Sequence, residues 1–175
     1  MKRLAKRPGQ KRAKPLRKKS EVSLRARALQ YLARREYSRA ELRGKLLPHV
    51  QTDADFEHAS PVNLDALLDD LAARGWLSDV RAATQLVHAK RSRFGAQRIA
   101  HELRQKGIAE ELISAALPEL KNSELEAARC VWQKKFGAAP QDEKEKARQV
   151  RFLQSRGFGF EVIFQLLRST ASSED

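Results

Sequence analysis

The chain has 175 residues, of which 41% are hydrophobic and 33% charged, so it can bury a core over at least part of its length. It contains no run of roughly 18 apolar residues, as a membrane-spanning helix requires, and no apolar segment of a signal peptide, so we expect a cytoplasmic protein. A single cysteine, Cys130, excludes a disulfide framework, and the helical pattern around it predicts a half-buried core thiol.

The positive charge is concentrated at the N-terminus. The formal net charge is +13, yet the first 20 residues hold ten Lys or Arg and no acid, which leaves 25 basic against 22 acidic residues elsewhere. Pro8, Gly9, Pro15 and the lack of apolar periodicity predict a disordered basic tail at 1–20. Attraction to a polyanion such as DNA and simple solubilisation are the two interpretations of this tail.

Helical periodicity dominates the rest of the chain. Almost no segment alternates like a strand, so the predicted fold class is all-α. Ser38 and Glu41 have capping-box spacing, Pro48 is expected to end the second helix before a polar surface loop, and Gly75 stands where a left-handed C-terminal cap is expected. The nine expected helices are Val22–Arg35, Ser38–Pro48, Val62–Arg74, one beginning at Asp79, Ala96–Lys106, Ala109–Ala116, Ser123–Phe136, Glu143–Ser155 and Phe160–Arg168.

Three segments share one template: REYSRAELRGKL, RSRFGAQRIAHEL and SRGFGFEVIFQLL. In each, Ser or Gly follows an aromatic residue, Leu or Ile stands five residues after the aromatic, and Leu stands nine after it. This spacing predicts a helix corner in which the aromatic packs between two helices, the Ser or Gly starts the second helix and the later pair is buried. The three pairs are Tyr37 and Ser38, Phe94 and Gly95, and Phe158 and Gly159.

The template predicts an elongated tandem array of three small helix-turn-helix-like modules. One copy has too few apolar residues to be stable alone, so neighbouring copies should pack together. We expect modules at 21–77, 78–120 and 121–175, the last with a short C-terminal tail. Chance similarity among short helical hairpins is the alternative explanation of the repeat.

Surface charge differs among the copies. Between Lys90 and Lys106 six basic residues oppose the single acid Glu102, a local excess of +5, so this stretch is the best candidate for a binding face. Phe94 is expected in the core and Arg98 on the surface. A solvated helix face is the alternative for every such run. The candidates for binding a partner or nucleic acid are Arg39, Arg43, Lys90, Arg91, Arg93, Arg98, Arg104 and Lys106.

No pattern predicts catalysis. The four histidines have no partner at metal-ligand spacing, and no Gly-rich phosphate loop precedes a helix. The acidic pairs Asp53 with Asp55 and Asp69 with Asp70 are typical of a solvated loop and a helix surface. We therefore expect a protein that is not an enzyme and holds neither cofactor nor metal. We also expect the protein to be a monomer.

From about Val22 to Arg168 the chain resembles the RecX regulators of bacterial recombination. The resemblance is carried by ALQYLARREYSRAELRGKL, LLDDLAARGWLSDVRAATQLVHAKRSRFGAQRIAHELRQKGI and RFLQSRGFGFEVIFQLL, in the family's order and spacing; the basic tail lies outside it. It implies three tandem three-helix modules that bind the RecA recombinase filament on DNA and inhibit its ATP hydrolysis and strand exchange. The implied processes are recombination, DNA repair and the SOS response.

A helix-turn-helix regulator of transcription is the alternative function. Such a protein usually presents one recognition helix per subunit and dimerises on a palindromic site. Three different corners in one chain suit a repeating polymer better.

Overall fold

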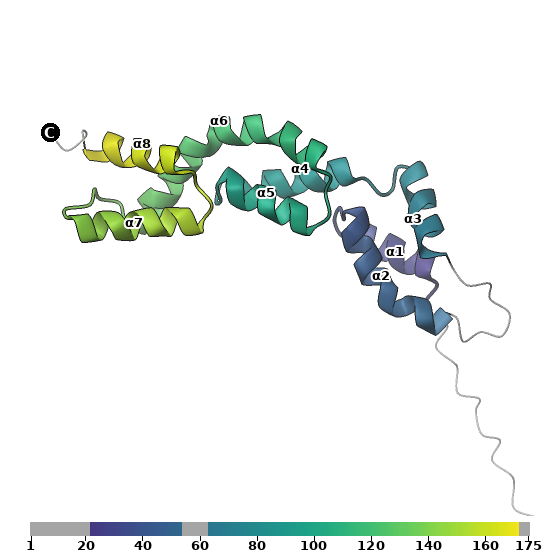
Figure 1. Ribbon diagram of the computed structural model, residues 1–175. Helices are drawn as coiled ribbons and strands as arrows, with labels where there is room; N and C mark the ends of the chain where they lie inside the picture. Colours follow the sequence, from purple (N-terminus) through teal and green to yellow (C-terminus); the bar gives the residue numbers. More distant parts are fainter. Residues whose placement is uncertain (1–21, 54–62, 172–175) are drawn as a thin grey trace, which may run out of the picture.

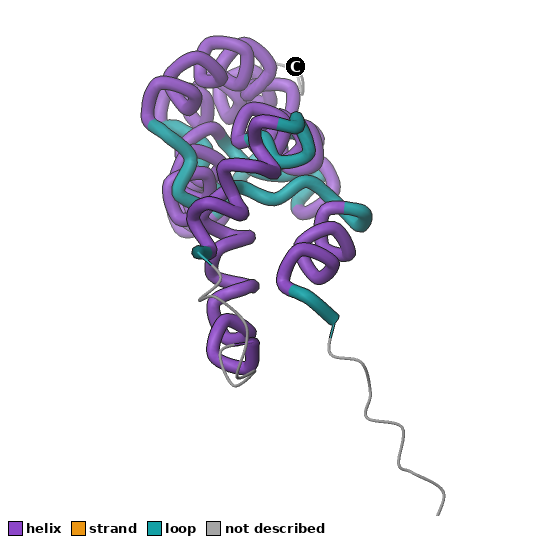
Figure 2. Tube along the Cα trace, turned by 90° about the vertical axis from the view of Figure 1, so that its right-hand side faces the viewer, coloured by secondary structure: helices purple, strands orange, loops and turns teal. Residues whose placement is uncertain are grey.

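The computed structural model describes residues 22–53 and 63–171, which form eight helices and no strand (Figures 1 and 2). The predicted all-α class is confirmed; the predicted basic tail and most of the predicted surface loop lie outside the described residues. No helix in the described ranges is long and apolar enough to cross a membrane. The helices are α1 (Leu24–Leu32), α2 (Arg39–Asp53), α3 (Leu64–Ala73), α4 (Asp79–Lys90), α5 (Ala96–Gln105), α6 (Glu110–Lys135), α7 (Glu143–Ser155) and α8 (Phe160–Ala171).

The helices form an elongated, bent array with α1, α2 and α3 at one end and α7 and α8 at the other (Figure 1). Buried residues of the described chain gather in three separate hydrophobic clusters. We call the parts around them module 1 (α1 to α3), module 2 (α4, α5 and the first half of α6) and module 3 (the second half of α6, α7 and α8). The predicted tandem array is therefore confirmed.

The repeated template marks the start of the second helix in each module. The carbonyl oxygen of its Ser or Gly accepts the first helical hydrogen bond from the N–H group four residues later. These bonds run from Leu42 to Ser38 (2.9 Å), from Ile99 to Gly95 (3.2 Å) and from Ile163 to Gly159 (3.0 Å). The apolar positions five and nine residues after the aromatic are buried in all copies: Leu42, Leu46, Ile99, Leu103, Ile163 and Leu167.

The aromatic position of the template is less uniform. Tyr37 and Phe158 are buried, with 7% and 2% of their surface exposed. Phe94 packs against the module 2 cluster but is only half-buried. The expectation of a core residue at Phe94 is therefore only partly correct, because cationic side chains rather than a helix cover its outer side.

Two prolines lie inside helices that the sequence predicts to break there. Helix α2 continues past Pro48 to Asp53, and Val50 beyond the proline packs against the module 1 cluster. Helix α6 continues through Pro118, so the two helices expected between Ala109 and Phe136 are one and the prediction of nine helices is wrong. Val50 and Leu120, each two residues beyond a proline, pack in the clusters of modules 1 and 2, so tertiary contacts favour helix on the far side of each proline.

Modules 2 and 3 share helix α6. Its 26 residues extend over about 39 Å at 1.5 Å per residue. Ile113 and Leu120 of its first half belong to the module 2 cluster, whereas Ala128 and Trp132 of its second half belong to the module 3 cluster. The predicted boundary at residue 120 therefore falls within a continuous helix.

Candidate functional site

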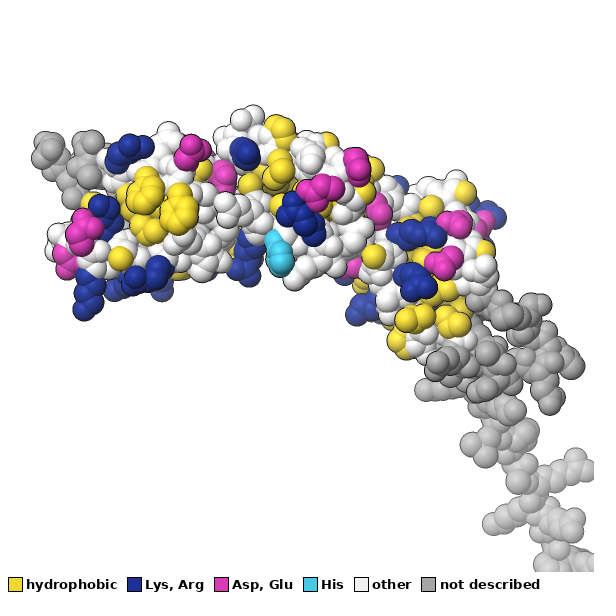
Figure 3. All heavy atoms as spheres, in the orientation of Figure 1, with side chains coloured by type: hydrophobic (Ala, Val, Ile, Leu, Met, Phe, Trp, Pro, Cys, Tyr) yellow, Lys and Arg dark blue, Asp and Glu magenta, His cyan; other side chains and the backbone are white. Residues whose placement is uncertain are grey.

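Six of the eight basic residues predicted as a binding surface are paired with carboxylates. The pairs are Arg39 with Asp69 (2.8 Å), Arg43 with Asp65 (3.2 Å), Lys90 with Glu102 (3.3 Å), Arg91 with Glu119 (3.3 Å), Arg104 with Glu110 (2.6 Å), and Lys106 with Glu41. The hydrogen bond from Arg104 lowers the pKa of Glu110 below its usual value. Basic and acidic side chains accordingly lie side by side on much of the face in Figure 3. The local charge excess read from the sequence is largely neutralised by the fold.

The other two predicted residues, Arg93 and Arg98, form no ion pair within the described ranges, and both lie beside Phe94. Their guanidinium carbons are 6.0 and 4.7 Å from the centre of the Phe94 ring. Lys90 and Arg156 approach the same ring at 5.3 and 5.6 Å. Each cation–π contact of this kind contributes about 0.5–1 kcal/mol at an exposed site. Phe94 is therefore the centre of a four-cation cluster.

A groove beside this cluster collects further positive charge. It has a volume of about 510 Å³, and we call it the junction groove because module 2 and module 3 both line it. Its lining contains four basic side chains and no acidic one. The lining residues are Ser92, Arg93, Cys130, Val131, Lys134, Lys135, Phe152 and Arg156. None of the four cations pairs with a carboxylate in the part of the chain that the structure describes.

The sequence prediction missed Lys134, Lys135 and Arg156. Lys134 and Lys135 lie in the last turn of α6, and Arg156 follows α7 as its C-cap. Counting charge along one segment does not reveal a groove whose basic residues come from three segments. Cys130 also departs from expectation, since it is exposed in the groove while the neighbouring Val131 packs against the module 3 cluster.

Aromatic rings fix the position of Arg156. Its guanidinium carbon lies 5.1 Å from the centre of Phe152 as well as 5.6 Å from that of Phe94. Phe152 in turn makes an edge-to-face contact with Phe136, with ring centres 5.3 Å apart. Two rings from different modules thus hold one guanidinium group at the groove.

The groove depends on the contact between modules 2 and 3, which we call the second junction. The N–H group of Gly95 donates to the carbonyl of Arg156 at 3.0 Å, and Arg98 donates to the carbonyl of Ser155 at 2.8 Å. A Cβ atom on Gly95 would lie 2.1 Å from the carbonyl oxygen of Gly157. Gly157 has φ +84°, and a Cβ there would meet that of Arg98 at 2.3 Å. Both positions therefore require glycine.

A buried carboxylate strengthens this junction. Glu124 of α6 is 7% exposed, and its Oε1 atom accepts hydrogen bonds from the N–H groups of Ala96 (3.1 Å) and Gly159 (3.3 Å). Gly95 and Gly159 have no side chain with which to cap α5 and α8. Glu124 caps both helices instead, and its carboxylate is attracted to the positive N-terminal ends of both helix dipoles.

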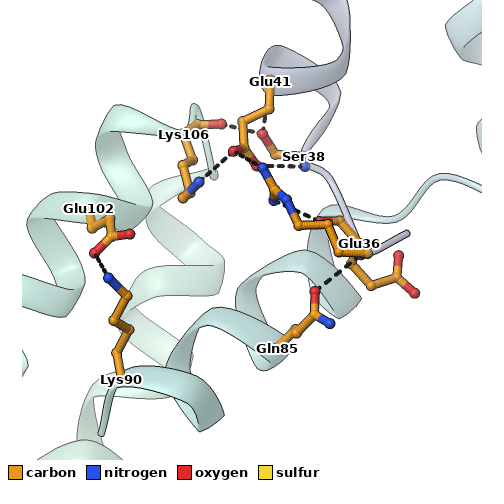
Figure 4. Close-up of polar contacts among 8 residues, drawn as sticks. Glu36, Ser38, Glu41, Gln85, Lys90, Glu102 and Lys106 are labelled. Atoms are coloured by element: carbon orange, nitrogen blue, oxygen red, sulfur yellow. Dashed lines mark hydrogen bonds and ion pairs between the residues drawn. The ribbon is translucent and has the colours of Figure 1, made fainter. Parts of the chain in front are cut away.

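Module 1 meets module 2 at the first junction, where polar side chains bond to one another and to backbone groups (Figure 4) and Gly107 lies close to Ala40. The capping box is confirmed: Ser38 Oγ accepts from the N–H of Glu41 at 3.1 Å, and Glu41 Oε2 accepts from the N–H of Ser38 at 3.2 Å. Ser38 Oγ also donates to the carbonyl of Lys106. Burial opposes ionisation of Glu41, but hydrogen bonds from Lys106 and Arg35 outweigh it and lower the pKa of Glu41. Lys106 therefore joins two modules.

An exposed apolar surface lies over α7 and α8 (Figure 3). Phe160 and Phe164 of α8 are 57% and 43% exposed, and their rings stack with centres 6.0 Å apart. A neighbouring hollow of about 650 Å³ is lined in part by Phe164, Leu167 and Pro140. Exposed aromatic pairs of this kind are typical of protein contact surfaces.

Comparisons with known proteins agree with the repeat. Family models for the second and third three-helix domains of RecX match residues 78–117 and 122–167. The chain is 46% identical over 155 residues to the regulatory protein RecX of Leptothrix cholodnii, which covers 89% of this chain and 94% of that protein. The RecX of Chromobacterium violaceum is 43% identical over 152 residues, or 87% and 93% of the two chains. A crystal structure of RecX from Lactobacillus salivarius shares the fold, with a TM-score of 0.67 at 18% identity over 85% of this chain and 94% of that one.

Proposed function

Since the chain belongs to the RecX family of regulatory proteins, we propose that it binds RecA recombinase filaments on DNA and inhibits their ATP hydrolysis and strand exchange. In this role it restrains recombination, DNA repair and the SOS response in the cytoplasm. It acts as a monomer, by binding rather than by catalysis.

The observation that carries this proposal is the tandem array of three modules. An elongated chain in which α6 alone extends about 39 Å can contact more than one subunit of a polymer. Contacts to neighbouring subunits are then linked through one chain, so each later contact forms at the high effective concentration that the first one sets. Such a protein binds a filament far more tightly than it binds one recombinase molecule.

Two candidate recognition helices, α2 and α5, have buried N-terminal ends, which disfavours the helix-turn-helix alternative. A sequence-reading helix places its N-terminal residues against base edges in the major groove. Here Ser38, before α2, is fully buried and bonded to Lys106, and Gly95 and Ala96, at the start of α5, are buried and bonded to module 3. These ends of α2 and α5 are occupied by protein.

A titration of DNA-dependent ATP hydrolysis by RecA tests the proposal. We expect most of the activity to be lost at a small fraction of one copy per recombinase subunit, because one bound copy disturbs several subunits. Co-sedimentation with filaments, with naked single-stranded DNA as the control, measures the binding itself. One-to-one stoichiometry with equal affinity for isolated RecA subunits would contradict filament bridging.

A further inference from the structure

We propose that the junction groove is a binding site for the phosphodiester backbone of DNA. This inference rests on the proposed function, because it assigns the DNA of the filament to one surface of the chain. Three of the four basic residues of the groove, Lys134, Lys135 and Arg156, lie outside the basic stretch from Lys90 to Lys106.

The charges of the groove are the first argument. Elsewhere on the described chain most of the predicted basic residues are neutralised by carboxylates, whereas Arg93, Lys134, Lys135 and Arg156 have no such partner. Like charges gathered in a concave surface repel one another and focus the positive potential outward. A bound polyanion removes that repulsion, so the groove is suited to a ligand that carries several negative charges in a row.

The fixed geometry of the arginines is the second argument. Arg156 contacts the rings of both Phe94 and Phe152, and the guanidinium carbon of Arg93 lies 6.0 Å from the centre of the Phe94 ring. Side chains that are already ordered lose little conformational entropy on binding. The planar fork of arginine matches phosphate oxygens in pairs, and the ammonium groups of Lys134 and Lys135 add point charges beside it.

The apolar part of the lining distinguishes this groove from a site for a small free anion. Val131 and Phe152 lie among the cations, and the volume of about 510 Å³ is far larger than one phosphate group requires. Basic grooves that contain aromatic side chains are typical of sites for nucleic-acid strands, in which sugars and bases cover the apolar surface between phosphates. A DNA strand therefore fits the lining better than inorganic phosphate does.

The test uses the full chain and naked DNA, without recombinase. Lys134→Gln with Lys135→Gln removes two groove charges, and Lys121→Gln with Lys144→Gln removes two exposed charges outside the groove as the matched control. Fluorescence anisotropy with a labelled single strand and a labelled duplex gives the observed binding constant over a range of salt concentrations. The logarithmic salt slope should fall by about 1.4 on the single strand and about 1.8 on the duplex for the groove variant.

The control variant should keep the wild-type salt slope, because its two lysines lie outside the groove. The basic tail is present in every protein compared, so it contributes equally to each slope. Both double variants change exposed side chains, so their thermal melts should match that of the wild type. A change in DNA binding then cannot be caused by loss of folded protein. Equal slopes for the groove and control variants on both DNAs would overturn the inference. If the groove variant keeps its DNA binding but no longer inhibits the RecA filament, the groove contacts recombinase; the DNA assignment is then wrong while the proposed function stands.

Discussion

The two junctions between modules are built by different kinds of contact. At the first junction, side chains meet across separate helices, chiefly through Ser38, Glu41 and Lys106. At the second junction, helix α6 runs through both modules and the backbone of Gly95 lies against that of Gly157. Side-chain ion pairs respond to pH and salt, whereas backbone contacts between glycines do not. The first junction therefore depends mainly on charged and polar side chains, whereas the second also contains a close backbone contact.

This difference explains where the junction groove is found. Arg93 comes from module 2 and Arg156 from module 3, so the distance between them is set by the second junction. A groove assembled across the first junction would depend instead on side-chain contacts such as the ion pair of Glu41 with Lys106. Two of the groove cations, Arg93 and Arg156, therefore lie on either side of a backbone contact that holds the modules together.

The largest expected effect follows from adding one methyl group at the second junction. Gly95→Ala should lower the free energy of unfolding by about 2–5 kcal/mol, because the new Cβ atom meets a backbone carbonyl and the two modules must separate. Gly44→Ala is the matched control: it lies in α2 with nothing within 4 Å of the added atom, and should stabilise by about 0.5–1 kcal/mol. Urea unfolding measures both. Wild-type stability of Gly95→Ala would show that the glycines do not fix the junction.

An intermediate effect is expected at the buried carboxylate of the second junction. Glu124→Ala removes the acceptor shared by the N–H groups of Ala96 and Gly159, and should cost about 1–3 kcal/mol. Glu124→Gln keeps a carbonyl oxygen in the same place and should lose clearly less. The comparison is made by urea unfolding at neutral pH. Equal losses in the two variants would mean that the side chain fills space and does not cap the helices.

The smallest effect is expected at the first junction, where it depends on pH. The pKa of Glu41 is lowered in the folded chain from its usual 4.5, so its contribution to stability is present above about pH 4.5 and is lost as the pH falls through the lowered value. Lys106→Met removes one cause of the lowering, so stability should fall less steeply below pH 4.5 than in the wild type. Thermal melts between pH 3 and pH 7 measure this slope. An unchanged slope would assign the lowered pKa to Arg35 and the Ser38 N–H group alone.

The sequence predicts the parts of the fold that local spacing controls. The template correctly marks the buried pair after each corner, the capping box at Ser38 and the left-handed C-terminal cap at Gly75, where φ is +72°. Helix α7 begins and ends where its periodicity indicates, at Glu143 and Ser155. Each of these features depends on residues less than about three helical turns apart.

Features that depend on residues far apart in the sequence cannot be predicted from local spacing. Lys106 meets Glu41 from 65 positions away, and Arg91 meets Glu119 from 28, so a local count of charge cannot tell a paired cation from an unpaired one. The continuity of α6 through Pro118 likewise depends on packing in two different modules. Local charge therefore predicts a basic stretch in module 2, whereas the pairing of six of the eight candidate residues with carboxylates depends on the fold.

Because α6 is continuous, it also fixes the rotation of module 3 about the helix axis. Each residue turns an α-helix by about 100° and advances it by about 1.5 Å. One residue inserted between Leu120 and Glu124 would swing α7 and α8 about a quarter of a circle around α6, which would carry Arg156 away from Phe94 and Glu124 away from Ala96. Substitutions at the exposed positions of this turn, Lys121 and Asn122, leave that angular phase intact. Homologous chains that keep the second junction should therefore vary in sequence along this turn but not in its length.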